Sequence, residues 1–383
     1  MEIQYTRRLE KIEAVLDEWL PDPSALSGQA KPGSSWLETT FGGWPLQEKS
    51  GRDRLQTNLV SEYAAELVRP CWDLYKRGGK RWRPLLMVLT AESIAGESGG
   101  EAALPFTPLV EFPHNASLIH DDIEDNSDER RGKPAVHLIY GTDTAINSGA
   151  FLYFLPLACL SAWAEDHRNC HKDTDLINNI WAIWADHMRA LHLGQAMDIS
   201  WHRDYHSLPG LDEYDRMCRL KTGRLASLAA VLGVYCSGVS AARKDVAGLA
   251  KVFGEAAEQL GVGFQILDDI MNLDTGIPGK KRGDDIVEGK KSLPVLLYLH
   301  RYPEKADFAA RCFAAARDQG TGAPEVEEFI GALEEAGVLE EALEKGLGYI
   351  RESRRIYSAP ECAGFPLKKE GQELLTGLID SLN

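Results

Sequence analysis

The sequence predicts an all-α protein, built as a single large helical bundle around a central cavity. From about residue 61 to 357, apolar residues recur at helical spacing in one segment after another, separated by short breaks rich in glycine and proline. The sequence has no sustained period-two alternation and none of the Asn-Gly turns that join hairpin strands. Polar residues interrupt the apolar faces of four helices, which indicates a cavity inside the bundle.

The composition limits the class of protein. The chain has 383 residues, with 42 Lys plus Arg against 58 Asp plus Glu, so its formal net charge is −16. This acidity argues against nucleic acid as the main partner. Seven scattered cysteines without a Cys-x-x-Cys pair argue against a disulfide framework and favour a cytoplasmic location. No run of about 18 uncharged apolar residues is evident, so no membrane span is expected.

The first 60 residues differ from the rest of the chain. Residues 1–20 have apolar positions near helical spacing, whereas 21–60 are rich in proline, glycine and serine. We therefore expect an N-terminal extension over 1–60 and an all-helical domain over 61–383. The composition of the extension is compatible with a disordered tail, a dimer wrap or a lid.

The first of the four helices begins near Thr107, with Pro108 at its first position. Asp121 and Asp125 lie four residues apart, so their carboxylates are neighbours on one face of this helix. Pro113 lies inside the stretch, where a proline kinks a helix or delays its regular start.

The other three helices show the same change from apolar to polar along one face. Their polar members are Gln195 and Asp198 on the first, Lys221 on the second, and Gln265, Asp268 and Asn272, with Asp269 adjacent, on the third. Any one of these is most simply a salt-bridged or solvated helix face. Four together predict a cavity that is apolar at one end and charged at the other, because isolated buried charge is costly.

The charged residues indicate the chemistry of that cavity. Clustered carboxylates repel one another and need cations, and ligands that are all oxygen suit a hard ion such as magnesium. Basic residues lie near these acids in the sequence: Lys80, Arg81, Arg83, Arg130, Arg131, Lys221, Lys280, Lys281, Arg282, Lys290 and Lys291. Acidic and basic clusters around one cavity indicate a magnesium–polyphosphate site. With an apolar remainder, the expected substrate is an amphiphilic diphosphate.

Several motifs occur in a recognisable order. They are Gly78-Gly79-Lys80-Arg81-Trp82-Arg83-Pro84, Asp121-Asp122-Ile123-Glu124-Asp125 with Arg130-Arg131-Gly132, Gly194-Gln195-Ala196-Met197-Asp198, Lys221-Thr222-Gly223, and Phe264-Gln265 before Asp268-Asp269-Ile270-Met271-Asn272. With these motifs the chain resembles the trans-isoprenyl (polyprenyl) diphosphate synthases, most closely the geranylgeranyl diphosphate synthases of eukaryotic type, over about residues 70–300. The resemblance implies the isoprenoid synthase fold and a homodimer.

The resemblance also implies an activity and a role for each matching residue. The activity is a prenyltransferase reaction that condenses isopentenyl diphosphate with an allylic diphosphate, head to tail. Asp121, Asp125 and Asp268 would hold about three magnesium ions, and Arg130, Lys221 and Lys281 would bind the allylic diphosphate. Lys290 would also bind substrate. Lys80, Arg83, His114 and Arg131 would bind isopentenyl diphosphate, and Thr222 and Gln265 would face the allylic cation. Asp122 belongs to the catalytic motif, and Gln195, Asp198, Asp269 and Asn272 support the metal end.

Product length depends on the wall of the tail cavity. Ala116 and Ser117, one turn before the first motif, are small, so no aromatic ring stops the chain at that level. Phe151, Tyr153 and Phe154 on the neighbouring helix are bulky enough to close the cavity lower down. We therefore expect geranylgeranyl diphosphate, a twenty-carbon product, with farnesyl or longer-chain products as alternatives.

Other functions fit the motifs less well. His120-Asp121 is also typical of metal-dependent phosphohydrolases, but that function leaves Asp268 and the basic residues without a role. A class I terpene cyclase would not need the basic residues of the second substrate site. A non-catalytic synthase-like regulatory subunit usually loses one or both aspartate motifs, whereas here only Asn272 departs from the pattern.

One further pair of residues has the spacing of a metal site. His202 and His206 lie four residues apart and could share a zinc ion, but no acidic motif accompanies them. We interpret them as a surface or loop pair.

Overall fold

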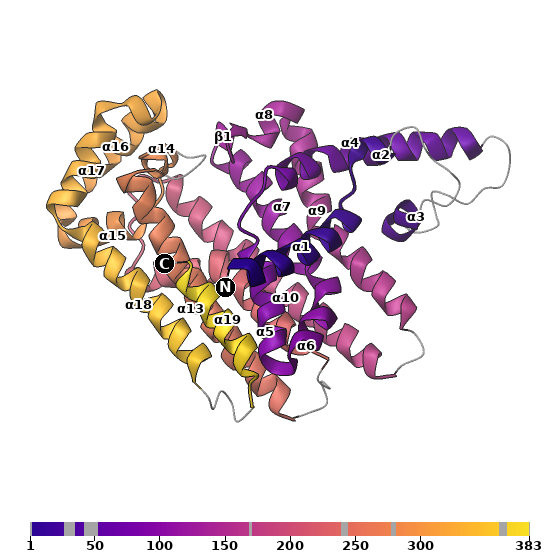
Figure 1. The fold of residues 1–383 in the computed structure, drawn as a ribbon. Helices are drawn as coiled ribbons and strands as arrows, with labels where there is room; N and C mark the ends of the chain where they lie inside the picture. Colours follow the sequence, from indigo (N-terminus) through magenta and orange to yellow (C-terminus); the bar gives the residue numbers. More distant parts are fainter. Residues whose placement is uncertain are drawn as a thin grey trace.

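The computed structural model describes residues 2–26, 35–41, 53–167, 171–238, 244–276, 281–359 and 366–382. Within these ranges the fold is helical except for a short hairpin, in which β1 (Glu129–Arg130) pairs antiparallel with β2 (Lys133–Pro134) (Figure 1). The prediction of an all-α bundle is confirmed.

The first half of the described chain forms one set of helices. They are α1 (Glu2–Trp19), α2 (Pro23–Leu26), α3 (Ser35–Phe41), α4 (Asp53–Lys76), α5 (Trp82–Ala95), α6 (Glu97–Ala103), the 3₁₀ turn η2 (Leu104–Phe106), α7 (Pro108–Glu124), α8 (Val136–Tyr140), α9 (Thr142–Asp166) and α10 (His171–His202).

The second half continues the bundle. Its elements are α11 (Leu211–Cys218), the π-helical turn η3 (Arg219–Gly223), α12 (Arg224–Tyr235), α13 (Lys244–Asp274), α14 (Asp284–Glu288), α15 (Leu293–Arg301), η4 (Pro303–Lys305), α16 (Ala306–Gln319), η5 (Gly320–Gly322), α17 (Pro324–Glu335), α18 (Val338–Ser358) and α19 (Lys369–Asp380). Helix α13 packs against both α12 and α18, and α7 packs against α9.

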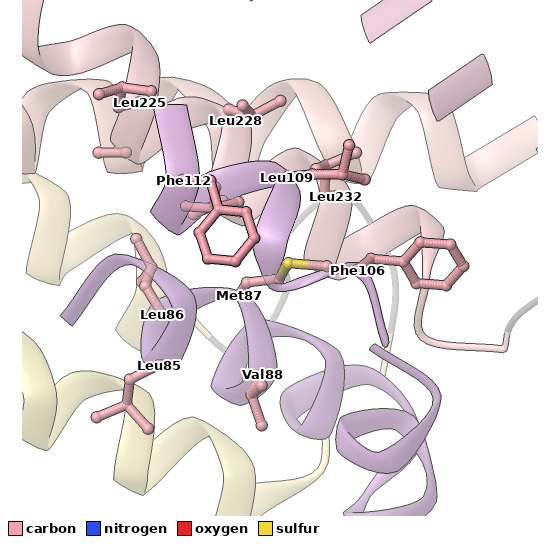
Figure 2. Close-up of a cluster of buried hydrophobic side chains, with 14 of the residues drawn as sticks. Leu85, Leu86, Met87, Val88, Phe106, Leu109, Phe112, Leu225, Leu228 and Leu232 are labelled. Carbon is pink, nitrogen blue, oxygen red and sulfur yellow. The ribbon is translucent and has the colours of Figure 1, made fainter. Parts of the chain in front are cut away.

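Two clusters of buried apolar side chains hold the helices together. The larger cluster includes residues of α1, α4, α5, α7, α9, α10, α12 and α19 together with the first half of α13. Figure 2 shows part of it, where leucine, methionine and phenylalanine side chains of α5 and α7 meet leucines of α12. The second cluster joins α11 and the last half of α13 to α15–α18, which lie together at one side of the molecule (Figure 1).

The N-terminal helix is part of the larger cluster. Ile12 and Leu16 of α1 are fully buried, and Leu20 follows them at 1% exposure. Helix α3 is attached through its aromatic side chains, since Phe41 stacks on Phe151 of α9 with ring centroids 5.9 Å apart. The described parts of residues 1–60 therefore pack on the same core as the helices that follow, while 27–34 and 42–52 lie outside the described residues.

Helix α7 runs from Pro108 to Glu124 with Pro113 inside it. A proline has no amide hydrogen, so the carbonyl of Leu109, four residues earlier, loses its usual helical donor. The indole nitrogen of Trp184 on α10 donates to this carbonyl at 3.2 Å. Trp184 therefore supplies the hydrogen bond that Pro113 removes, which lets a helix with an internal proline pass through the core.

Helix α9 corrects the expectation that no segment is long and apolar enough to span a membrane. It contains an 18-residue window with a mean hydropathy of 1.5, so by length and composition it meets the test for a membrane-spanning helix. Half of that window is buried inside the protein. Its apolar composition is explained at least in part by packing against α7 and α4.

Candidate active site

A cavity of about 360 Å³ opens among the helices that carry the sequence motifs. Most of the residues predicted for the site line it: Lys80, Arg83, His114, Ser117, Asp121, Arg130, Arg131, Gln195, Asp198, Lys221, Thr222, Gln265, Asp268, Asp269 and Lys290. Leu118, Leu191, Met217, Leu225 and Phe264 also line it. The structure thus brings the acidic, basic and apolar stripes of separate helices to one space, as the sequence predicts.

At the charged end, lysines from other elements cover the carboxylates of α7. The Lys221 ammonium lies 2.6 Å from an oxygen of Asp198 and 3.4 Å from one of Asp121. The Lys290 ammonium lies 2.9 Å from Asp125 Oδ2, and the Asp125 side chain is only 1% exposed. Burial by itself would raise the pKa of Asp121, but the Lys221 charge holds that pKa below its usual value.

Asp122 faces away from the cavity and orients a cation that faces into it. The side chain of Asp122 is fully buried, and its Oδ1 accepts hydrogen bonds from Arg130 Nε at 2.8 Å and Nη2 at 2.5 Å. Arg130 lines the cavity. The second aspartate of the motif therefore fixes the direction of this guanidinium.

Lys221 and Thr222 lie on η3, a π-helical turn between α11 and α12. Such turns occur frequently at functional sites because they redirect one or two side chains. Two glycines allow neighbouring helices to approach this turn. A Cβ atom on Gly194 of α10 would lie 2.4 Å from the backbone nitrogen of Lys221, and one on Gly261 of α13 would lie 2.7 Å from the Gly223 Cα. Both distances are too short for a side chain, so only glycine fits at these two positions.

A chain of hydrogen bonds runs from Thr222 into the core. Thr222 Oγ1 donates to Gln265 Oε1 at 2.7 Å, and Gln265 Nε2 donates to Asp269 Oδ1 at 2.8 Å. The hydroxyl of buried Tyr214 donates to the other Asp269 oxygen at 2.8 Å. Because Asp269 accepts from both, the Gln265 amide nitrogen points at Asp269 and its oxygen points at Thr222. Burial raises the pKa of Asp269 to about 7.

Sequence reasoning did not single out Tyr214. In the sequence, Tyr214 stands on the same apolar helix face as Lys221, and its hydroxyl group is the one feature that could have indicated a polar role.

The second basic group consists of Lys80, Arg83, Arg131 and the neighbouring His114, all of which line the cavity. Arg83 Nη1 lies 3.4 Å from His114 Nε2, and the Arg83 guanidinium lies 4.4 Å from the centre of the Trp82 ring. Burial lowers the pKa of Arg83 and of Arg131 to about 10 each. Burial, together with the Arg83 charge, also holds the pKa of His114 well below its usual value, so His114 is neutral near pH 7.

Only part of the wall expected at the tail end lines the cavity. Tyr153 lines the cavity, and its ring lies between those of His120, at 5.7 Å, and His192, at 5.1 Å. Phe154 is 65% exposed and points away from the cavity. Successive helical residues differ by about 100° in direction, so Tyr153 and Phe154 cannot both face inward.

Two more of the expected wall residues lie outside the lining. Phe151 packs on Phe41, and Ala116 is fully buried in the core. Besides Tyr153, Ser117 is the member of the expected wall that lines the cavity.

Asn272 and Lys281 also lie outside the lining. Asn272 is 1% exposed, and its side-chain oxygen accepts from the Asp285 backbone amide at 3.1 Å. Its backbone carbonyl accepts from Gly283 at 2.9 Å, so this residue fixes the start of α14. The side chain of Lys281 is exposed.

The two histidines do not behave as a pair. His206 is exposed, and its Nδ1 lies 3.9 Å from Asp307. His202, at the end of α10, is only 5% exposed. The interpretation of both as a surface pair is therefore wrong for His202.

The donor set fits a hard divalent cation. Seven carboxylates line the cavity: Glu111, Asp121, Glu124, Asp198, Asp268, Asp269 and Asp285. In addition, Asp125 Oδ1 is buried and accepts no hydrogen bond from the described residues. Within the described part of the chain, no three acidic, imidazole or thiolate side chains converge as a preformed metal site. The lysines account for this, since they occupy the oxygens that a metal would take.

Comparisons with known proteins show what the chain is similar to. The sequence profile of the polyprenyl synthetase family matches residues 64–329. The geranylfarnesyl diphosphate synthase of Aeropyrum pernix is 29% identical, over 80% of this chain and 90% of its own. A geranylgeranyl pyrophosphate synthase of Rhodocybe pseudopiperita is 33% identical, over 71% of this chain and 77% of its own. Among solved structures, the geranylgeranyl pyrophosphate synthetase of Pyrococcus horikoshii Ot3 superposes with a TM-score of 0.74 at 22% identity, covering 100% of this chain and 98% of that one.

Lys291 provides a test of the electrostatics of this cavity. Its side chain lines the cavity at 2% exposure, donates to the Gly289 carbonyl at 3.2 Å and lies 4.2 Å from the centre of the Phe313 ring. Burial lowers its pKa from 10.5 to about 8. The native protein therefore releases this proton before the unfolded chain does, and the free energy of unfolding should rise between pH 8 and 10.5.

Lys291→Met should stabilise the protein at pH 7, by up to about 3 kcal/mol, and should remove the rise in stability from pH 8 to 10.5. Urea unfolding at several pH values measures both effects. Lys251→Met is the control, because Lys251 is 76% exposed and its loss should change stability by less than about 0.5 kcal/mol. A Lys291→Met protein that is less stable than the wild type at pH 7 would contradict this account.

Proposed function

Because the chain belongs to the polyprenyl synthetase family, we propose that it condenses isopentenyl diphosphate head to tail with an allylic diphosphate and makes geranylgeranyl diphosphate. One observation carries this proposal. A single cavity is lined by carboxylates, by two sets of cations (Arg130, Lys221 and Lys290; Lys80, Arg83 and Arg131) and by an aromatic and apolar wall. Two groups of cations suit two diphosphates, and the wall suits an isoprenoid tail.

The charged end supports binding and ionisation of the allylic substrate. Asp121, Asp125 and Asp268 would hold magnesium, about three ions, which when bound neutralise charge on the allylic diphosphate and help it leave. Lys221 and Arg130 line the same end, so their charges can bind the diphosphate directly. The carbon–oxygen bond breaks, and its electron pair leaves with the diphosphate.

The hydrogen-bonded chain from Thr222 faces the carbon that becomes positive. The Gln265 amide is held with its oxygen toward Thr222, because its nitrogen is committed to Asp269. Oxygen atoms fixed in this direction stabilise a developing cation without having to reorganise. The double bond of isopentenyl diphosphate then attacks this carbon, and the released diphosphate takes the proton that is lost.

The second basic group suits the diphosphate of isopentenyl diphosphate. Lys80, Arg83 and Arg131 line the cavity and supply positive charge, and neutral His114 adds a hydrogen-bond donor. The magnesium ions are expected at the allylic diphosphate, so this second diphosphate would be bound by the cations alone.

The purified protein, given magnesium, isopentenyl diphosphate and an allylic diphosphate of five, ten or fifteen carbons, should make mainly a twenty-carbon product. Mass spectrometry identifies the product, and EDTA should abolish its formation, since the carboxylates could no longer be neutralised by metal. Release of inorganic phosphate without condensation would instead favour the phosphohydrolase. A folded protein that condenses none of the three starters would favour the regulatory subunit.

We further propose that Tyr153 sets the product length. Tyr153→Ala should remove the central ring of the three that close the tail end and raise the share of products longer than twenty carbons, read by mass spectrometry. Phe154→Ala is a matched control from the next position on α9, and its product length should not change because that side chain is 65% exposed. The proposal fails if both variants give the wild-type product, or if Phe154→Ala alone lengthens it.

A homodimer is the remaining part of the proposal. Six large apolar residues on α8–α10 are at least 43% exposed: Leu138, Ile139, Ile146, Phe154, Trp181 and Leu193. Exposed apolar side chains concentrated on neighbouring helices are typical of a protein interface.

Sedimentation equilibrium should give twice the chain mass of 42.4 kDa. Leu193→Glu should shift the protein toward 42.4 kDa, because it would bury a charge in the interface. Leu343→Glu, on α18 at 40% exposure, serves as the control and should leave the mass unchanged. Monomeric wild-type protein would exclude the dimer.

A further inference from the structure

A buried ion pair lies beside the second basic group, and none of the motif roles accounts for it. Arg81 Nη1 lies 2.8 Å from Glu111 Oε1, with side chains only 3% and 2% exposed. Both residues line the cavity. Desolvating two charges costs free energy that their attraction often does not recover, so such a pair is weak evidence of a purely stabilising role.

Arg81 has a backbone conformation that needs support. Its φ is 49° and its ψ is 27°, in the left-handed region, at the residue just before α5. Such a conformation persists in a residue other than glycine only where the surroundings hold it. Here its guanidinium donates to Glu111 and, at 2.7 Å, to the Tyr75 carbonyl, and it stacks 4.4 Å from the centre of the Tyr75 ring.

The same carboxylate reaches the loop that carries Arg131. Asn115, which is 1% exposed, donates from Nδ2 to Glu111 Oε1 at 2.8 Å. The Asn115 oxygen accepts from Arg131 Nη1 at 3.3 Å, and the same nitrogen donates to the Leu74 carbonyl at 3.2 Å. Arg131 also has a left-handed backbone, with φ 54°. Glu111 is thus connected to both of the strained arginines.

The two guanidinium groups converge at Gly79. A Cβ there would lie 3.1 Å from Arg131 Nη2 and 3.2 Å from Arg81 Nη1. Like charges this close repel strongly in a partly buried site. Glu111 contacts one of them directly and the other through Asn115, so it offsets the repulsion and gives each group a fixed direction.

We propose that Glu111 is a positioning residue that holds Arg81 and, through Asn115, Arg131, so that the second basic group is preformed for the diphosphate of isopentenyl diphosphate. This inference rests on the proposed function. It assigns to Glu111 no contact with the allylic substrate, because Glu111 lies in the first turn of α7, whereas Asp121 and Asp125 lie at the other end of that helix. Loss of Glu111 should therefore affect one substrate and not the other.

Glu111→Gln should raise the KM for isopentenyl diphosphate by about tenfold to a hundredfold, as expected when a hydrogen bond between charged groups is weakened. The KM for the allylic diphosphate and kcat at saturation should stay within about twofold. Glu92→Gln is the matched control, because Glu92 on α5 is also buried, at 5% exposure. It pairs with Arg8 of α1 at 2.6 Å and does not line the cavity. A purely structural role would make the two variants alike in stability and in both KM values.

Asn115→Ala keeps the Arg81–Glu111 pair but breaks the link to Arg131, so it should produce a smaller rise in the same KM. It also tests the inference if Glu111→Gln does not fold. The inference is overturned if Glu111→Gln raises both KM values equally or leaves the KM for isopentenyl diphosphate unchanged.

A second readout separates this inference from the proposed function. In EDTA the carboxylate end lacks metal, so inorganic pyrophosphate should bind mainly at the basic group, and calorimetry measures its affinity. Weaker pyrophosphate binding by Glu111→Gln than by Glu92→Gln supports the positioning role even if the wild-type protein condenses no starter. Equal binding by the two variants refutes it, whatever the activity.

Discussion

The charged end of this bundle depends on the neutralisation of carboxylates that one helix carries into its interior. Helix α7 places Asp121, Asp122 and Asp125 within two turns, and each is covered by a cation from a different element. Lys221 comes from the π turn, Arg130 from the hairpin and Lys290 from the segment before α15. These pairs therefore join the two halves of the chain at the point where like charges would otherwise force them apart.

The same arrangement explains why the site shows no preformed metal geometry among the described residues. A lysine on a carboxylate supplies charge without chelation, and its flexible side chain can turn to another anion. Under the proposed function, a metal bound with a diphosphate would replace the lysines on the carboxylates, and the lysines would bind the phosphate oxygens. The charges would exchange partners, so no carboxylate or ammonium would be left alone in the cavity at either stage.

Much of this site follows from the sequence, because helical spacing determines which residues share a face. Asp121, Lys221 and Gln265 were predicted to face a cavity, and they line it. Spacing does not say which element lies opposite a given face. For this reason the indole donor of Trp184 to the Leu109 carbonyl was not foreseen.

The residues at the tail end of the cavity show more clearly what helical spacing cannot predict. Tyr153 and Phe154 are adjacent bulky residues, and only the direction in which α9 faces α7 and α10 decides which of them closes the cavity. The roles of Tyr214 and Glu111 depend likewise on partners distant in the sequence. Residues that touch a ligand recur in motifs, whereas residues that hold them are defined by packing, and packing is what the sequence pattern leaves undetermined.

Several buried polar groups in this fold direct a charged or amide side chain. Tyr214 and Asp269 fix an amide, Asp122 fixes one guanidinium, and Glu111 connects two more. An apolar core of the same volume would be more stable, because each of these groups loses water on burial. Their common property is that every one ends on a side chain lining the cavity. The cost in stability is therefore best understood as the cost of preorganisation, which lets charge develop in a cavity whose dipoles already point the right way.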